Sequence, residues 1–271
     1  MAAEESRVRE RLTLALPGAL LAAFLVLPLL ALAGTATPDE LLRGLGHPLV
    51  APALRLSATT TAVSTTIVVL LGVPLAWWLS RARGRWASLA ETVLQLPIVV
   101  PPAVAGVALL LAFGRRGVAG PALEALGVVI PFSTTAVVLA EVFVAAPFFL
   151  QAGVSAFRRI DDRLILVARS LGASPSTLLV RVAMPLAAPG LVAGAAMSWA
   201  RALGEFGATL MFAGNMEGVT QTLPLAIYTA LESDLRAAQA ISLVLVVMAF
   251  ALLALVRVAL HRFERALGPS V

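Results

Sequence analysis

The chain has 271 residues, of which 60% are hydrophobic and 13% are charged, and its mean hydropathy is +0.95. Soluble domains are ordinarily about 45–50% apolar and about 25% charged, and disordered chains contain even less apolar surface. The composition therefore excludes both classes and indicates an all-α polytopic membrane protein. The sequence contains neither cysteine nor lysine. This excludes a disulfide framework, a thiolate metal site and the lysine of a Walker A loop.

Six apolar stretches are long enough to cross a bilayer core, which needs about 20 helical residues each. The first is too long for a signal-peptide core, so we predict that it is not cleaved. We expect one domain over residues 1–271, with a tail and first helix in 1–52, a core in 53–260 and a long inner loop in 157–188. The predicted spans are Leu12–Ala33, Leu56–Leu79, Leu89–Phe113, Phe132–Ala152, Pro189–Phe212 and Ala237–Leu260.

The arginines orient these spans. With the N-terminus in the cytoplasm, 14 of the 20 arginines fall on the inner side and one, Arg201, falls within a span. The five on the outer side are Arg43, Arg55, Arg115, Arg116 and Arg236. Because inner loops of membrane proteins are rich in Arg, both termini are predicted to be cytoplasmic. The net charge of +5 thus indicates a topology in the lipid bilayer of the cytoplasmic membrane, not nucleic-acid binding.

The inner loop has the pattern of two short helices joined by a tight turn. Asp161 or Asp162 can cap a helix start, and Gly172 suits a left-handed helix end. Four apolar residues between them share one face, which leaves a ridge for a partner. The other interpretation is an ordinary amphipathic helix at the membrane surface. The candidate residues of this loop are Arg163, Leu164, Val167, Ala168, Leu171, Gly172, Ala173, Ser174 and Pro175.

The same loop resembles the ATPase-coupling loop of ABC-importer permeases. That family's pattern is Glu-Ala-Ala, three residues, Gly, nine residues, Ile-x-Leu-Pro. Residues at the matching spacing here are Ala168, Gly172, Val182 and Pro185. Leu166 and Val167 stand in place of the Glu and the first Ala, so the salt bridge of that Glu is not expected, whereas the helix–Gly–helix geometry is.

Three further segments narrow the resemblance. They are Leu96–Gly106, the Arg201-Ala202-Leu203-Gly204-Glu205-Phe206-Gly207 stretch, and Gly214-Asn215 with Gln221-Thr222-Leu223-Pro224. Together they look like the molybdate/tungstate branch of the type I permeases, whose nearest relatives carry sulfate. This resemblance implies a pathway formed by two copies of the chain. It also implies two ATPase subunits that bind ATP and Mg²⁺, and an extracytoplasmic binding protein that delivers the oxyanion. The chain itself would bind no cofactor or metal and would have no catalytic residue.

Several polar residues lie within the spans and are candidates for the pathway or its gate. An ionised Arg at mid-bilayer costs about 2.5–3.5 kcal/mol, so Arg201 needs a partner such as Glu205 or an aqueous cavity. Ser198, Arg201, Glu205 and Thr209 make one polar stripe. Such a stripe either lines an anion pathway or locks helices together, and span hydroxyls can serve either purpose. Glu141 is either protonated or paired with Arg201. The candidates are Thr59, Thr60, Ser64, Pro101, Ser198, Arg201, Glu205 and Thr209.

Three other functions are alternatives. A sulfate or thiosulfate importer permease of the same architecture would have the same pattern. A self-contained channel or ion-coupled carrier would leave the inner loop unexplained and would need more charged residues at the midplane. A membrane-embedded enzyme would need clustered acids, bases or nucleophiles, which this sequence lacks.

Overall fold

The computed structural model describes residues 2–35 and 37–267, with side chains for 15–35 and 37–258. Every regular element in this part of the chain is helical. They are α1 (Ala2–Gly34), α2 (Pro38–Leu45), α3 (Val50–Arg81), α4 (Arg85–Val99), α5 (Pro102–Phe113), α6 (Gly120–Ala125), α7 (Thr134–Arg158), α8 (Asp162–Ser170), α9 (Pro175–Thr177), the π-helix η1 (Leu178–Ala183), α10 (Met184–Leu203), α11 (Gly207–Ala213), α12 (Leu223–Leu231) and α13 (Leu235–Leu267). Five helical segments are long and apolar enough to span a membrane, and the bent pair α4–α5 makes a sixth. The predicted all-α fold with about six spans is confirmed.

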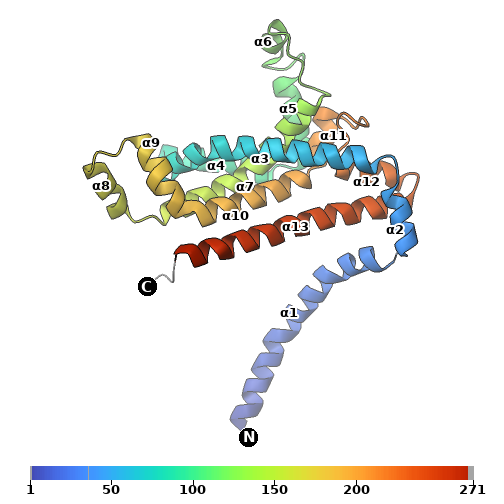
Figure 1. The fold of residues 1–271 in the computed structure, drawn as a ribbon, viewed down its shortest axis with the longest axis horizontal. Helices are drawn as coiled ribbons and strands as arrows, with labels where there is room; N and C mark the ends of the chain where they lie inside the picture. The colour runs from blue at the N-terminus through green and yellow to red at the C-terminus, as the bar shows by residue number, and fades with distance from the viewer. Residues whose placement is uncertain (1, 36, 268–271) are drawn as a thin grey trace.

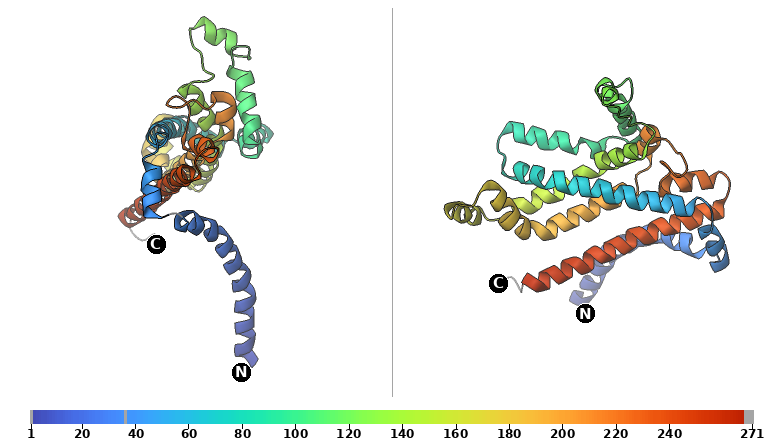
Figure 2. Two further views of the ribbon diagram at one scale, coloured as in Figure 1. Left: turned by 90° about the vertical axis from the view of Figure 1, so that its right-hand side faces the viewer. Right: turned by 45° about the horizontal axis from the view of Figure 1, so that its top comes forward.

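The long helices form one bundle with short helices at its two ends (Figure 1). α3, α7 and α10 pack closely along the bundle, α4 lies against α7, and α13 against α10. The short helices α8 and α9 lie at one end, whereas α2 and α12 lie at the other (Figure 1). α1 leaves the bundle, and none of its apolar segment Ala15–Gly34 is buried (Figure 2). The hydrophobic surface of α1 is therefore left for lipid or for another chain.

Small residues let α10 approach α7 closely. A Cβ added at Gly194 would lie 2.8 Å from Cβ of Ala152, and Gly190 faces Ala156 in the same way. Gly190 and Gly194 form a Gly-x3-Gly pattern, which suits close approach of membrane helices, and both lie at this contact.

Replacing Gly194 with leucine should force these two helices apart. Overpacking of a close contact costs about 1–3 kcal/mol. We expect a lower midpoint of thermal unfolding in detergent for Gly194→Leu. The matched control is Gly18→Leu in α1, where an added Cβ meets no atom within 4 Å. Equal midpoints for the two variants would contradict the packing described above.

The predicted third span, Leu89–Phe113, is divided into two helices at its adjacent prolines. α4 ends at Val99, α5 starts at Pro102, and the two are bent by 115°. Pro102 disfavours helical backbone at the residue before it, and Pro101 does the same to Val100. Val100 and Pro101 accordingly have extended backbone, with ψ of 126° and 137°. Pro97, in contrast, is accommodated within α4.

The predicted fifth span, Pro189–Phe212, has the wrong limits. Its helix starts well before Pro189, since the membrane-spanning segment covers Pro175–Leu203, and it ends at Leu203. The carboxylate of Glu205 accepts a hydrogen bond from the Ala208 amide at 2.8 Å, which starts the separate helix α11. Hydropathy continues across this break, so apolar periodicity alone does not reveal it. The inner segment between α7 and α10 is correspondingly shorter than the predicted 157–188.

Candidate functional site

The end of the bundle formed by α8 and α9 carries a helix–turn–helix elbow, which we define as residues 161–177. Asp161 caps α8 by accepting a hydrogen bond from the Arg163 amide at 2.8 Å. At the other end, the Ala173 amide donates to the Ala168 carbonyl and the Gly172 amide to the Arg169 carbonyl. These two hydrogen bonds define a Schellman motif, which satisfies carbonyls that the helix end would otherwise leave unpaired.

The turn of the elbow depends on Gly172. Its φ is +83°, in the left-handed region that favours glycine. Ser174 then caps the next helix by accepting a hydrogen bond from the Thr177 amide, and Pro175 is the first residue of that helix. The helix, tight turn and helix predicted from the sequence are present, with the predicted caps.

The exposed face of α8 forms an apolar ridge, which we define as Leu164, Val167 and Leu171. Their exposed fractions are 48%, 58% and 83%. Ala168, predicted to share this face, packs instead on the bundle core beside the buried Ile165. The prediction placed four residues on one face, but an amphipathic helix on a core must turn one flank inward, and the small Ala168 lies on that flank.

Arg81 clamps the elbow to the bundle, and Arg158 joins two of the spans beside it. Arg81 at the end of α3 forms an ion pair with Asp162 of α8 and donates to the Phe157 carbonyl of α7 at 3.0 Å. Arg158 at the end of α7 makes two hydrogen bonds to the Glu91 carboxylate of α4, at 2.7 and 3.2 Å. Displacement of α8 would therefore be passed on to three spans.

Most of the hydroxyls predicted to line the pathway form hydrogen bonds with helix backbone groups. Ser64 is buried and donates to the Thr61 carbonyl, and Ser198 donates to the Ala145 carbonyl of α7 at 3.1 Å. Ser57 accepts a hydrogen bond from the Leu223 amide at 2.8 Å, which holds the start of α12 against α3. These contacts match the packing role of hydroxyls in spans.

Glu141 meets a hydroxyl rather than an arginine. Its Oε1 accepts a hydrogen bond from Thr60 at 2.7 Å, its Oε2 is buried without a partner, and the residue is 1% exposed. The pairing with Arg201 considered from the sequence is not formed, because Arg201 is engaged elsewhere. The partner lies 81 positions away in the chain, so no local pattern indicates it.

Removing the Thr60 hydroxyl should destabilise the bundle. Thr60→Val keeps the shape of the side chain but leaves the Glu141 carboxyl without a donor, which costs about 1–3 kcal/mol for a buried group. The measurement is thermal unfolding in detergent. Thr66→Val is the control, since the exposed Thr66 bonds only to its own helix. A Thr60→Val protein as stable as the control would contradict this role for the hydrogen bond.

Arg201 and Glu205 form an ion pair of 2.6 Å, with side chains 27% and 1% exposed. Glu205 is therefore doubly engaged, because its other oxygen caps α11. Thr209 is buried within α11, and its hydroxyl has no partner among the described residues. The four-residue stripe predicted on one helix is thus wrong beyond Arg201, although its ion pair is present.

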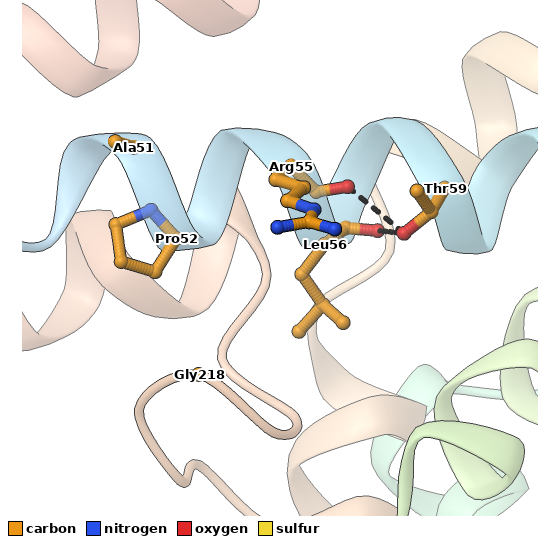
Figure 3. Close-up of a pocket in the computed structure, with 6 residues that line it drawn as sticks. All are labelled: Ala51, Pro52, Arg55, Leu56, Thr59 and Gly218. Atoms are coloured by element: carbon orange, nitrogen blue, oxygen red, sulfur yellow. Dashed lines mark hydrogen bonds between the residues drawn. The ribbon is translucent and has the colours of Figure 1, made fainter.

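A pocket of about 450 Å³ opens beside the first turns of α3, at the end of the bundle opposite the elbow. In Figure 3 the side chains of Arg55 and Thr59 lie along one side of α3, with the Gly218 loop below. Thr59 donates to the carbonyls of Arg55 and Leu56 (Figure 3). Arg55 forms no ion pair within the described part of the chain. Sequence reasoning selected Thr59 but missed Arg55, which its spacing of four residues from Thr59 could have indicated. Pro101, another predicted gate residue, is exposed at the α4–α5 break.

The chain is similar to known proteins over most of its length. A family profile for the binding-protein-dependent transport system inner membrane component matches residues 69–269. The molybdenum transport system permease protein ModB of Mycobacterium tuberculosis is 47% identical over 226 residues, covering 83% of this chain and 86% of that protein. ModB of Escherichia coli is 34% identical over 204 residues, covering 75% and 89%.

The fold has solved counterparts. A bacterial alginate ABC transporter, crystallised with an alginate-bound periplasmic protein, has a chain that matches this one with a TM-score of 0.70 and 14% identity. The match covers 97% of this chain and 98% of that one. The residues matched by the family profile include α3 from Val69 onward, the elbow, α10 and the Arg201–Glu205 ion pair. The chain therefore belongs to the family of binding-protein-dependent transport system inner membrane components, as a multi-pass permease.

Proposed function

We propose that this chain is the membrane permease of an ATP-driven importer that translocates molybdate or tungstate. The single observation that carries the proposal is the elbow, a capped helix with an exposed apolar ridge clamped to the spans. The identity to molybdenum transport permeases supports the choice of substrate. The permease is a non-catalytic subunit, so ATP and Mg²⁺ would bind on a partner ATPase.

The elbow would receive the motion that drives transport. Two ATPase subunits, one for each copy of the chain, would contact the ridge. Because Arg81 and Arg158 tie this end to α3, α4 and α7, a shift of α8 would move these spans together. The break at Pro101 would let α5 move independently of α4. Access to the pathway would thereby switch between the two sides of the membrane.

A second copy of the chain would complete the pathway, with both termini in the cytoplasm. At the outer face, an extracytoplasmic binding protein would release the oxyanion near the Arg55 pocket. Arg offers forked donors that suit oxyanion oxygens, and Thr59 adds a hydroxyl. The neutral pair Arg201–Glu205 would add little net charge, so anion selection would belong mainly to the binding protein.

A charge on the ridge should prevent coupling. Leu171→Asp places a carboxylate in an apolar contact, where an unpaired charge is strongly unfavourable. We expect the ATPase subunit to be lost on co-purification, with normal membrane insertion. Leu126→Asp in the loop after α6, also on an exposed leucine, is the control. Retained ATPase with normal uptake in Leu171→Asp would contradict the docking role of the ridge.

The decisive test is reconstitution with a candidate ATPase subunit and a candidate oxyanion-binding protein. We expect ATPase activity to be stimulated by the binding protein loaded with molybdate or tungstate. Stimulation by sulfate or thiosulfate instead would identify the sulfate importer of the same architecture. Oxyanion uptake by liposomes that contain this chain alone would identify a self-contained channel or carrier.

A further inference from the structure

A second pocket of about 540 Å³ lies at the inner end of the bundle, between the last turn of α3 and α8. Two tryptophans, Trp77 and Trp78, and three arginines, Arg81, Arg83 and Arg169, line it. The acidic member is Asp162, which is already paired with Arg81. Three arginines and one aspartate leave two positive charges on a pocket that is partly lined by indole rings.

The sequence of α3 places this pocket at the level of lipid headgroups. α3 has 32 residues, so at 1.5 Å per residue it is about 48 Å long and extends beyond a hydrocarbon core of about 30 Å. Trp78 is 55% exposed and stands just before Arg81 and Arg83, which is the order of residues at a membrane interface. The exposed Trp86 follows on α4, with the Arg85 guanidinium 5.4 Å from its ring centre.

The arginines retain donors for a ligand. Arg83 is 91% exposed, and its guanidinium is 4.0 Å from the Asp162 carboxylate, beyond hydrogen-bond distance. The Nε of Arg81 is buried without a hydrogen-bond partner. The central carbon of the Arg81 guanidinium lies 4.8 Å from the centre of the Trp77 ring. Forked arginine donors beside indole rings suit a phosphate group attached to an acyl chain.

The pocket and the ridge use opposite sides of α8. At 3.6 residues per turn, Asp162, Ile165, Leu166 and Arg169 cluster about 180° from Leu164, Val167 and Leu171. The exposed fractions of the ridge and the burial of Ile165 agree with this placement. A ligand in the pocket would therefore leave the ridge accessible.

From these observations we infer that this pocket binds the phosphate headgroup of an anionic phospholipid from the inner leaflet. Arg83 and Arg169 would hold the phosphate, and Trp78 would contact the upper acyl chain. This inference does not depend on the proposed transport function, since it requires only a bilayer and the geometry of the pocket.

The test is native mass spectrometry of the full-length chain in detergent, titrated with phosphatidylglycerol and with zwitterionic phosphatidylcholine. Each arginine near a headgroup contributes about five-fold in affinity, so Arg83→Ala/Arg169→Ala should lower the preference for phosphatidylglycerol about 30-fold. Arg83→Ala alone removes a side chain exposed to solvent, keeps the fold, and should lower it about five-fold. Arg181→Ala, an exposed inner arginine outside the pocket, should leave the preference unchanged.

Three results would overturn the inference. The first is equal binding of the two lipids by the unchanged chain. The second is a preference that survives the double substitution or falls equally in Arg181→Ala. The third is displacement of phosphatidylglycerol by an equal concentration of inorganic phosphate, which would identify a site for a soluble anion instead.

Discussion

Replacing Gly172 with valine or proline is expected to abolish ATP-driven transport while leaving the spans inserted. A left-handed conformation costs about 1–2 kcal/mol for an ordinary residue and more for a β-branched one, and proline cannot adopt a φ of +83° at all. The Schellman motif would open, and the ridge would change direction relative to α9. We expect stimulated ATPase activity and uptake to fall about ten-fold or more in the reconstituted transporter.

The chain offers a matched control for this backbone effect. Gly127 also has a positive φ, of +72°, and like Gly172 has no atom within 4 Å of an added Cβ. Gly127→Val should therefore have a similar backbone cost but should leave coupling intact. Gly172→Asn should retain most activity, because asparagine tolerates this conformation. Full transport by Gly172→Pro would show that the elbow does not carry the coupling.

Replacing Glu205 with glutamine should destabilise the protein more than the other substitutions. The amide oxygen can still cap α11, so the substitution isolates the loss of charge, which leaves Arg201 without its partner. Removing one member of a buried ion pair typically costs about 3–5 kcal/mol. Thermal unfolding in detergent and yield after membrane extraction would measure the effect. Glu91→Gln at the more exposed pair with Arg158 is the control, where we expect about 0–1 kcal/mol.

The double substitution Arg201→Gln/Glu205→Gln separates the two roles considered for this pair. It removes both charges, so we expect stability to return close to that of the unchanged protein. Uptake should return with it, because Glu205 is fully engaged by Arg201 and α11. A stable double variant that does not transport would assign Arg201 to the lining of the anion pathway.

The elbow could be predicted almost completely from the sequence because its determinants are local. Asp161, Gly172, Ser174 and Pro175 act on backbone groups within five positions of themselves. The number of spans follows equally from local hydropathy, and the break near Pro101 from the restriction that proline imposes on its neighbours. The size of the α4–α5 bend does not follow from the local sequence, since α5 is held by packing of Gly106 against α11.

What the sequence by itself determined is therefore the all-α membrane fold, the approximate spans and the helix–turn–helix elbow. The tertiary structure alone decided that Glu141 meets Thr60, that Ala168 faces the core, and that Glu205 ends α10 by capping α11. It also brought the arginines of α3 and α8 around one pocket. Periodicity and caps act over a few residues, whereas Glu141 must find its donor on a separate helix, because an unpaired polar group is costly in a low-dielectric interior.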